Sequence, residues 1–192
     1  MTREDFENGY EPLTQEELKE HIAELKGEPA IYVGTYGKYA GGSIDGAWID
    51  LTSFYDYEDF CEFCYRLHID EDDPEFMVQD FECFPKSWYC ESGLPDEETF
   101  EKIQEYAEMS ESDQEAYELW LDNYDSNASV DDFQDHYVGY YDSGEDFAEQ
   151  LYYELYEIPS HLDGFIDWKA VWRNLDTGGD YTEFDGHIFR CY

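Results

Sequence analysis

The sequence predicts an α+β protein built from three small domains with a highly acidic surface. Strand-like and helical segments alternate in the first half of the chain, helical patterns alone occupy the centre, and strands return together with helices near the C-terminus. The 192 residues include 19 Tyr, 13 Phe and 5 Trp, enough large apolar side chains for a folded core and too many for a disordered acidic chain. The formal net charge of -40 at pH 7 must then lie outside that core.

An N-terminal extension, residues 1–29, is expected to carry one helix. A capping box of Thr14 and Glu17 marks the start of this helix. Its apolar stripe consists of Leu18, Ile22 and Leu25. Gly27 and Pro29 end it, because neither residue continues a helix well.

Residues 30–92 are expected to form an α+β domain. Its strand candidates are rich in β-branched and aromatic residues, and a turn-prone segment, 37–42, separates the first two. The expected strands are Ala30–Tyr36, Ala47–Leu51 and Phe76–Glu82. The expected helix spans Tyr57–Leu67 and places Phe60, Phe63, Cys64 and Leu67 on one face.

Residues 93–135 are expected to form a central helical domain. Pro95 stands at the start of its first helix, and Ser110 with Asp113 begins the second. The apolar positions of these helices are Phe100, Ile103, Ala107, Ala116, Leu119, Trp120 and Tyr124.

Residues 136–192 are expected to form a C-terminal α+β domain. One helix begins at Ser143, and a second helix carries Trp168 and Trp172, which we expect in the core. The expected strands are Tyr137–Tyr141, Tyr181–Phe184 and His187–Cys191. Asp185-Gly186 joins the last two strands as a hairpin turn.

The balance of 50 Asp and Glu against 10 Lys and Arg indicates which class of partner to expect. Direct binding of nucleic acid or of an anionic membrane would need a basic face, which ten scattered cations do not supply. The partner should therefore be cationic, and DNA-binding proteins with Lys- and Arg-lined clefts are the obvious class. The sequence has no leader pattern and no run of 18 apolar residues, so we expect a cytoplasmic protein.

The stretch from Ile103 to Trp168 contains 19 Asp and Glu and no Lys or Arg. A solvated surface is the ordinary explanation for such residues, but it would tolerate Lys at i,i+4, and like charges at that spacing are destabilising. We therefore predict that these carboxylates mimic DNA phosphates, since forty charges match roughly twenty base pairs. The candidate partner-binding residues are Glu105, Glu108, Glu111, Asp113, Glu115, Glu118, Asp122, Asp125, Asp131, Asp132, Asp135, Asp142, Glu145, Asp146, Glu149, Glu154 and Glu157.

Other motifs do not make a catalytic or metal-binding pattern. Cys61 and Cys64 fall inside a predicted amphipathic helix, which favours reduced thiols over a zinc site. The five histidines are dispersed, and the acidic loops at 70–73 and 125–127 lack the Gly and Glu positions of an EF-hand. The sequence therefore predicts no catalytic residue, no metal and no cofactor.

Several ordered motifs resemble the ArdA antirestriction proteins of mobile genetic elements. The resemblance covers roughly residues 30–192 and leaves the first thirty residues outside it. It is carried by the segments Ile31–Tyr39, Gly46–Trp48, Asp80–Glu82, Glu157–Pro159, Phe165–Trp168, Trp172–Leu175 and Gly186–Phe189.

This resemblance implies a non-enzymatic, elongated chain that forms a curved, DNA-like homodimer. It implies inhibition of type I restriction-modification enzymes through their DNA-recognition and methyltransferase core, with no direct binding of nucleic acid or membrane. By the same resemblance, the dimer interface is expected at Tyr137, Val138, Tyr140 and Tyr141.

The sequence thus predicts a DNA mimic that occupies the DNA-binding groove of such an enzyme in competition with DNA. Two other functions share part of the charge argument. An acidic adaptor or chaperone would shield a basic nucleic-acid-binding protein, and a halophilic enzyme would carry its charge as an adaptation to salt.

Overall fold

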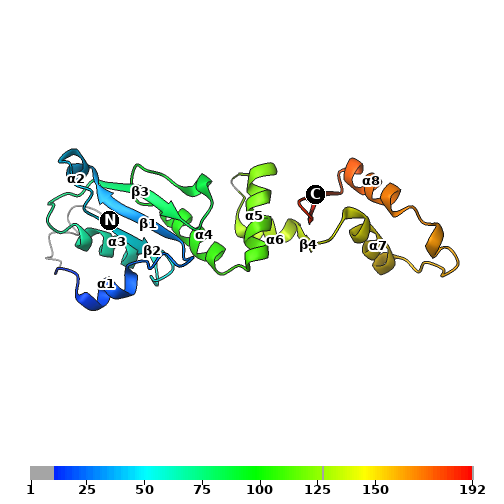
Figure 1. Ribbon diagram of the computed structural model, residues 1–192, viewed down its shortest axis with the longest axis horizontal. Helices are drawn as coiled ribbons and strands as arrows, with labels where there is room; N and C mark the ends of the chain where they lie inside the picture. Colours follow the sequence, from blue (N-terminus) through cyan, green and yellow to red (C-terminus); the bar gives the residue numbers. More distant parts are fainter. Residues whose placement is uncertain (1–10, 127, 192) are drawn as a thin grey trace. The chain divides into compact units, whose positions relative to one another are not determined.

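The computed structural model describes residues 11–126 and 128–191, shown as a ribbon in Figure 1. The contacts group the chain into two compact units, Met1–Met109 and Ser110–Tyr192. Each unit combines helices with a small antiparallel sheet, so the α+β prediction is confirmed. The division into domains at residues 93 and 136 stays a prediction.

The first unit is built around a three-stranded antiparallel sheet with the order β2-β1-β3. In the central strand, Ile31 pairs with Ile49 on one side and with Phe81 on the other. The three strands predicted for the first unit are confirmed, and so is the helix predicted after the second strand. The elements are α1 (Gln15–His21), β1 (Ala30–Thr35), α2 (Tyr36–Ala40), β2 (Ala47–Asp50), α3 (Tyr57–Leu67), β3 (Phe76–Glu82), the 3-10 helix η2 (Lys86–Trp88) and α4 (Glu97–Ala107).

Aromatic side chains of α3 and α4 form much of the core of the first unit. Phe60 of α3 is fully buried, and its ring stacks on that of Phe100 with the centroids 5.1 Å apart. The Gln104 amide of α4 donates hydrogen bonds to the carbonyl oxygens of Leu51 (3.0 Å) and Phe54 (3.1 Å). These bonds fasten α4 to the segment that follows β2.

The first helix is shorter than the sequence predicts. Its capping box is confirmed, but the helix ends at His21, and the expectation that Ile22 and Leu25 continue its apolar stripe is wrong. Ile22 instead forms an antiparallel bridge with Ile49, and the Ala23 N–H donates to the Trp48 carbonyl (3.1 Å). Edge strand β2 has backbone groups to satisfy, and their pairing with the extension replaces the last helical turn.

An ion pair also fastens the extension to α3. The Arg66 guanidinium donates to both carboxylate oxygens of Glu17, at 2.7 and 3.0 Å, and its Nε donates to the Glu11 carbonyl. These bonds, together with those from Thr14, lower the pKa of Glu17 to about 2. The described part of the extension is therefore docked on the first unit.

The segment predicted as a turn at 37–42 begins with a short helix. In Figure 1, α2 continues directly from the end of β1. The fully buried Thr35 is its N-cap, and the Thr35 hydroxyl accepts from the Lys38 N–H (3.2 Å). The glycines of the segment indicated a turn. The residue that starts the helix, Thr35, lies inside the predicted strand Ala30–Tyr36, which ends one residue earlier in the structure.

The second unit contains a three-stranded antiparallel sheet with the order β4-β6-β5. The predicted hairpin is confirmed, with positive φ at both turn residues, Asp185 (48°) and Gly186 (86°), as a tight two-residue hairpin turn requires. The elements are α5 (Glu111–Asn123), α6 (Val130–His136), β4 (Tyr137–Tyr140), α7 (Gly144–Leu155), the 3-10 helix η3 (Asp163–Phe165), α8 (Trp168–Gly178), β5 (Tyr181–Phe184) and β6 (His187–Arg190).

Two aromatic groups stabilise the second unit. The buried Trp120 ring of α5 stacks on Phe189 of β6, with the centroids 5.1 Å apart. Trp168 and Trp172 of α8 are only half-buried, so the prediction that they belong to the core is wrong. Trp172 covers Gly144, where a Cβ atom would come within 2.1 Å of the indole ring, because α7 and α8 pack in close contact.

Candidate functional site: an acidic surface

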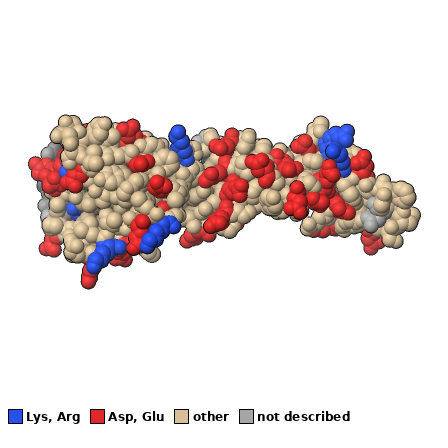
Figure 2. Space-filling view, in the orientation of Figure 1, with Lys and Arg blue, Asp and Glu red and all other residues tan. Residues whose placement is uncertain are grey.

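All seventeen predicted partner-binding carboxylates lie outside the two cores. Fourteen of them are exposed, and the other three, Asp113, Glu145 and Glu149, are partly exposed. Glu105 and Glu108 belong to the first unit and the remaining fifteen to the second. On the face shown in Figure 2, red acidic side chains gather over α5 and α6 without a Lys or Arg among the described residues there.

Four carboxylates form a stripe along α5, which we call the α5 stripe. They follow one another at intervals of four, three and four residues, so they share one face of the helix. The stripe consists of Glu111, Glu115, Glu118 and Asp122, all exposed. The buried face consists of Ala116, Tyr117, Trp120 and Leu121. Burial of the aromatic face thus fixes the direction in which the carboxylates point.

Helix α4 of the first unit carries a similar stripe, half of which the sequence analysis missed. Its members follow one another at intervals of four, four and three residues. They are Glu97, Glu101, Glu105 and Glu108, all exposed. The cation-free stretch of the sequence begins after Lys102, so the first two members lie outside it. The i,i+4 spacing of the acidic residues was the signal that would have included them.

Three of the predicted residues also stabilise helix starts. Asp113, Asp132 and Asp146 each stand three residues after a serine N-cap. In α7 the Asp146 N–H donates to the Ser143 hydroxyl (3.2 Å), and that hydroxyl donates back to the Asp146 carboxylate (2.6 Å). These three carboxylates therefore have a structural role that the α5 stripe does not share.

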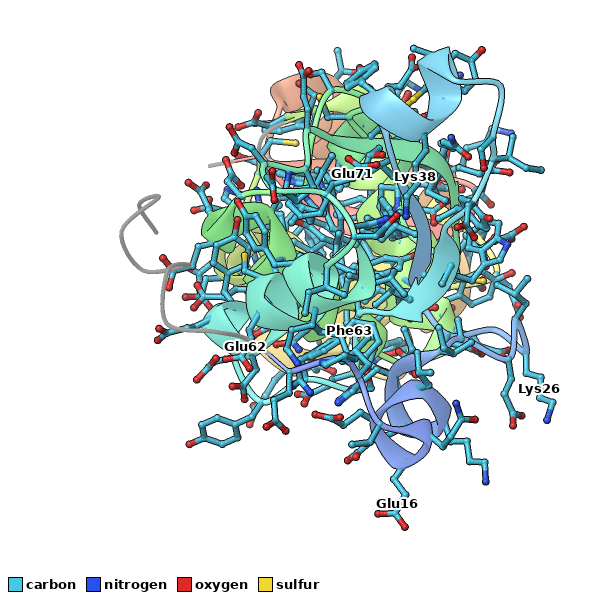
Figure 3. All side chains as sticks on the ribbon, turned by 90° about the vertical axis from the view of Figure 1, so that its left-hand side faces the viewer. Glu16, Lys26, Lys38, Glu62, Phe63 and Glu71 are labelled. Carbon is cyan, nitrogen blue, oxygen red and sulfur yellow. The ribbon has the colours of Figure 1, made fainter. Side chains whose placement is uncertain are left out.

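Several of the few cations are already paired within the protein. Lys38 Nζ lies 2.9 Å from Asp70 Oδ1 and 3.0 Å from His68 Nδ1, and Arg66 is bound by Glu17. Figure 3 labels Lys38 and also Glu71, whose carboxylate accepts from the Thr35 hydroxyl (2.7 Å). Such cations do not neutralise the helix stripes.

The second unit keeps a large unbalanced charge. Residues 110–192 contain 21 Asp and Glu against three Lys and Arg. Of these cations, Lys169 lies 3.8 Å from Glu145 across an exposed pair. An exposed pair at that distance contributes little. The first unit is equally acidic, with 29 Asp and Glu against seven Lys and Arg in residues 1–109, so the anionic surface is wider than the predicted stretch.

The predicted dimer residues lie on and beside an edge strand. β4 is at the edge of its sheet, and β6 is the strand that pairs with it among the described residues. Tyr140 is 59% exposed, whereas the Tyr137 hydroxyl bonds to His187 Nδ1 (2.9 Å) and Tyr141 packs its ring on Phe147. Val138 is half-buried.

The two cysteines of α3 lie in surroundings that disfavour the thiolate form. Burial raises the pKa of the Cys64 thiol well above its usual value and also raises that of Cys61, which makes both poor nucleophiles. The five cysteines are free thiols. Among the residues that the structure describes, no three His, Cys, Asp or Glu side chains come together to hold a metal ion. No helix in the same residues is long and apolar enough to cross a membrane.

Comparison with known proteins assigns the chain to a family. The family model described as "Antirestriction protein (ArdA)" matches residues 31–190. Comparison with individual curated proteins gave no match. The matched residues run without interruption from Ile31 in β1 to Arg190 at the end of β6, and they leave out the extension that contains α1. Because the match spans most of the chain, this protein belongs to the ArdA family of antirestriction proteins.

Proposed function

We propose that this protein inhibits a type I restriction-modification enzyme by occupying its DNA-binding groove in place of DNA. Family membership implies antirestriction activity and directs attention to restriction-modification enzymes as targets. The observation that carries the mechanism is the α5 stripe, four exposed carboxylates on one helix face with no cation beside them in the sequence. The protein then acts by binding alone, and no catalytic residue is needed.

The charge density of the α5 stripe approaches that of a DNA strand. Eleven residues of α-helix separate Glu111 from Asp122, which corresponds to about 16 Å along the axis at ~1.5 Å per residue. A single DNA strand carries about five phosphates over that length, at ~3.4 Å each. Four carboxylates therefore stand where an enzyme groove would meet four or five phosphates.

Phosphate-binding Lys and Arg side chains are the groups that such a stripe would meet. DNA-binding proteins use these contacts to position the duplex, and the contacts do not depend on base sequence. A carboxylate offers the same charge-assisted acceptors to a guanidinium or ammonium group. The stripe can therefore compete for the groove without copying any base sequence.

We also propose that the protein acts as a homodimer joined at β4. The extension pairs with β2 in the first unit, whereas β4 remains at the edge of the second sheet. An edge strand offers unpaired backbone groups to a second strand. Val138 and Tyr140 are the better candidates for the contact, since Tyr137 and Tyr141 already pack within their own unit. A dimer would double the number of exposed carboxylates that one inhibitor presents.

A competition assay tests the inhibition mechanism. Labelled duplex DNA bound to a type I enzyme is titrated with the protein, and we expect displacement whose midpoint rises with DNA concentration. The quadruple variant Glu111→Gln, Glu115→Gln, Glu118→Gln, Asp122→Asn should bind more weakly and with a shallower dependence on salt. The matched control keeps the charge by exchanging Glu for Asp, and Asp for Glu, at the same four positions.

The distributed-charge model makes a further distinction. Neutralising Glu115 alone should weaken inhibition only slightly, because neighbouring carboxylates remain. A single neutralisation that abolishes binding in a folded protein would contradict the model. Inhibition that does not respond to DNA concentration would instead favour the acidic adaptor, which binds surfaces for which DNA does not compete.

A further inference from the structure

A hollow of about 150 Å³ lies between α1 and α3 of the first unit, and we call it the α1–α3 hollow. One wall comes from α1 of the N-terminal extension, and the other comes from α3 and the segment just before it. Figure 3 labels Glu62 and Phe63 of α3, with α1 below them. The hollow has room for several water molecules. Aromatic side chains and carboxylates share its lining.

The aromatic part of the lining is packed, except for one ring that stays in solvent. His21 of α1 stacks on Phe54 with the centroids 4.2 Å apart, and it lies edge-on to Phe63 at 5.1 Å. The His21 Nδ1 also lies 2.9 Å from the Ser53 hydroxyl. Tyr55 borders the same hollow but is 92% exposed, the highest value among the large hydrophobic residues that the structure describes. Its ring is therefore available to a ligand that enters the hollow.

The charged part of the lining favours a cation. Three carboxylates border the hollow, and Arg66 is its one Lys or Arg residue. The Arg66 guanidinium is bound by both oxygens of Glu17 and lies 3.4 Å from Glu62. No described residue pairs with the carboxylate of Asp59, which lies three residues before Glu62 on the same face of α3. A cation in the hollow would thus meet one unpaired carboxylate and a second one that Arg66 only partly satisfies.

These groups select an organic cation over a metal ion. In the part of the chain that the structure describes, no three His, Cys, Asp or Glu side chains are placed to hold a metal. A guanidinium group is planar, stacks on aromatic rings and pairs with carboxylates through two hydrogen bonds. Arg66 already holds one guanidinium against Glu17 in this hollow. The exposed tyrosine ring and the remaining carboxylates match a second one.

We propose that the α1–α3 hollow binds the side chain of an arginine from a partner protein, with the guanidinium group on the Tyr55 ring and paired with Asp59 and Glu62. This inference rests on the proposed function in one point, that the target enzyme supplies the arginine. It adds a contact away from the helix stripes. One wall of the hollow belongs to the extension, which lies outside the residues that the family model matches. The contact therefore depends on a segment that this chain adds to the matched residues.

A small probe tests the site in the full-length protein without any enzyme. N-acetyl-argininamide is titrated while NMR follows the rings of Tyr55 and His21, and we expect saturable shifts with a Kd in the millimolar range. The citrulline analogue has the same shape but an uncharged head, so it should cause no such shifts. Equal shifts with both probes would overturn the proposal. Equal binding along the α5 stripe would also overturn it, because that result indicates general attraction of cations to an anionic protein.

Substitutions at the hollow have matched controls. Asp59→Asn should weaken probe binding about threefold or more, whereas Glu58→Gln should leave it unchanged. Both residues are acidic positions in the first turn of α3, so each loss affects the helix start alike, but only Asp59 lines the hollow. Tyr55→Leu removes the ring and should also weaken binding, whereas Tyr55→Phe should keep it. Equal effects within either pair would rule out the site.

The target enzyme provides the last measurement. Tyr55→Leu should raise the Kd for the type I enzyme severalfold, and Tyr55→Phe should bind like the unmodified protein. An unchanged Kd in Tyr55→Leu would overturn the assignment of the arginine to this enzyme. Failure of the proposed function appears separately, as an unmodified protein that duplex DNA does not displace, because probe binding to the hollow is measured without enzyme.

Discussion

At the scale of single residues, Lys38 of helix α2 contacts two side chains at and just beyond the end of α3, His68 and Asp70. Its side chain is 14% exposed, and its ammonium group reaches Asp70 and the buried His68 from helix α2. His68 is 1% exposed, and its second ring nitrogen, Nε2, lies 3.3 Å from the Val33 carbonyl. This arrangement fits a neutral imidazole that accepts from Lys38 and donates to Val33, with the tautomer inferred from the two partners.

Replacing Lys38 should therefore destabilise the protein. Lys38→Met leaves the buried Nδ1 of His68 without its donor, and we expect the free energy of unfolding to fall by about 1–3 kcal/mol. Chemical denaturation measures this change. Lys26→Met is the matched control, because the Lys26–Glu24 pair is about 70% exposed on both sides and its loss should change the stability little. Equal effects of the two substitutions would contradict the role given to Lys38.

The same cluster should respond to pH. Burial, followed by the charge of Lys38, lowers the pKa of His68 below its usual value of 6.5. The unfolded chain then binds a proton more readily than the folded protein, so the contribution of His68 to stability is present above pH 6.5. It is lost as pH falls from 6.5 through the lowered folded pKa.

A titration of the His68 ring by NMR measures this pKa directly. We expect its midpoint below 6.5 in the unmodified protein and at a higher pH in Lys38→Met, since that substitution removes the second cause of the shift. A midpoint at or above 6.5 in the unmodified protein would show that the ring is not held as described.

At the scale of elements, the acidic residues that cap helices and those that line a helix face differ in their contribution to stability. Ser143 and Asp146 satisfy each other at the start of α7, and the same pattern recurs at α5 and α6. Glu115, in the middle of the α5 stripe, instead has acidic neighbours at four and three residues, Glu111 and Glu118. Like charges at these spacings are mildly destabilising.

This difference predicts opposite effects of two small substitutions. Ser143→Ala should lower the free energy of unfolding by about 1 kcal/mol through loss of the cap. Glu115→Gln should leave it unchanged or raise it by a few tenths of a kcal/mol. Both values come from urea denaturation of the otherwise identical chain. A stability loss at Glu115 as large as that at Ser143 would mean that the stripe is structural and would weaken the proposed binding role.

At the scale of the whole molecule, the net charge of -40 opposes the compact state through repulsion among carboxylates. Added salt screens this repulsion, with a Debye length that falls from about 30 Å at 0.01 M to about 8 Å at 0.15 M. We expect the Tm to rise over this range of NaCl and then to level off. A Tm that keeps rising to molar salt would favour the halophilic interpretation.

Sequence patterns predicted the elements well where local residues decide them. The capping box at Thr14, the aromatic face of α3 and the turn at Asp185-Gly186 each depend on neighbours within a few positions, and all three are confirmed. The predicted end of α1 was wrong, because Ile22 pairs with Ile49, which is far away in the sequence. The half-buried state of Trp172 likewise depends on the approach of α7 to α8.

The sequence by itself determined the anionic character, the α+β class and the resemblance that the family match later confirmed. These follow from composition and from patterns of short range along the chain. Only the tertiary structure decided in which direction the shared face of Glu111, Glu115, Glu118 and Asp122 points, since Trp120 and Tyr117 bury the opposite side of α5. It also decided that the extension pairs with β2 and that apolar side chains between residues 153 and 165 stay exposed, because long-range packing determines which backbone edges and side chains remain uncovered.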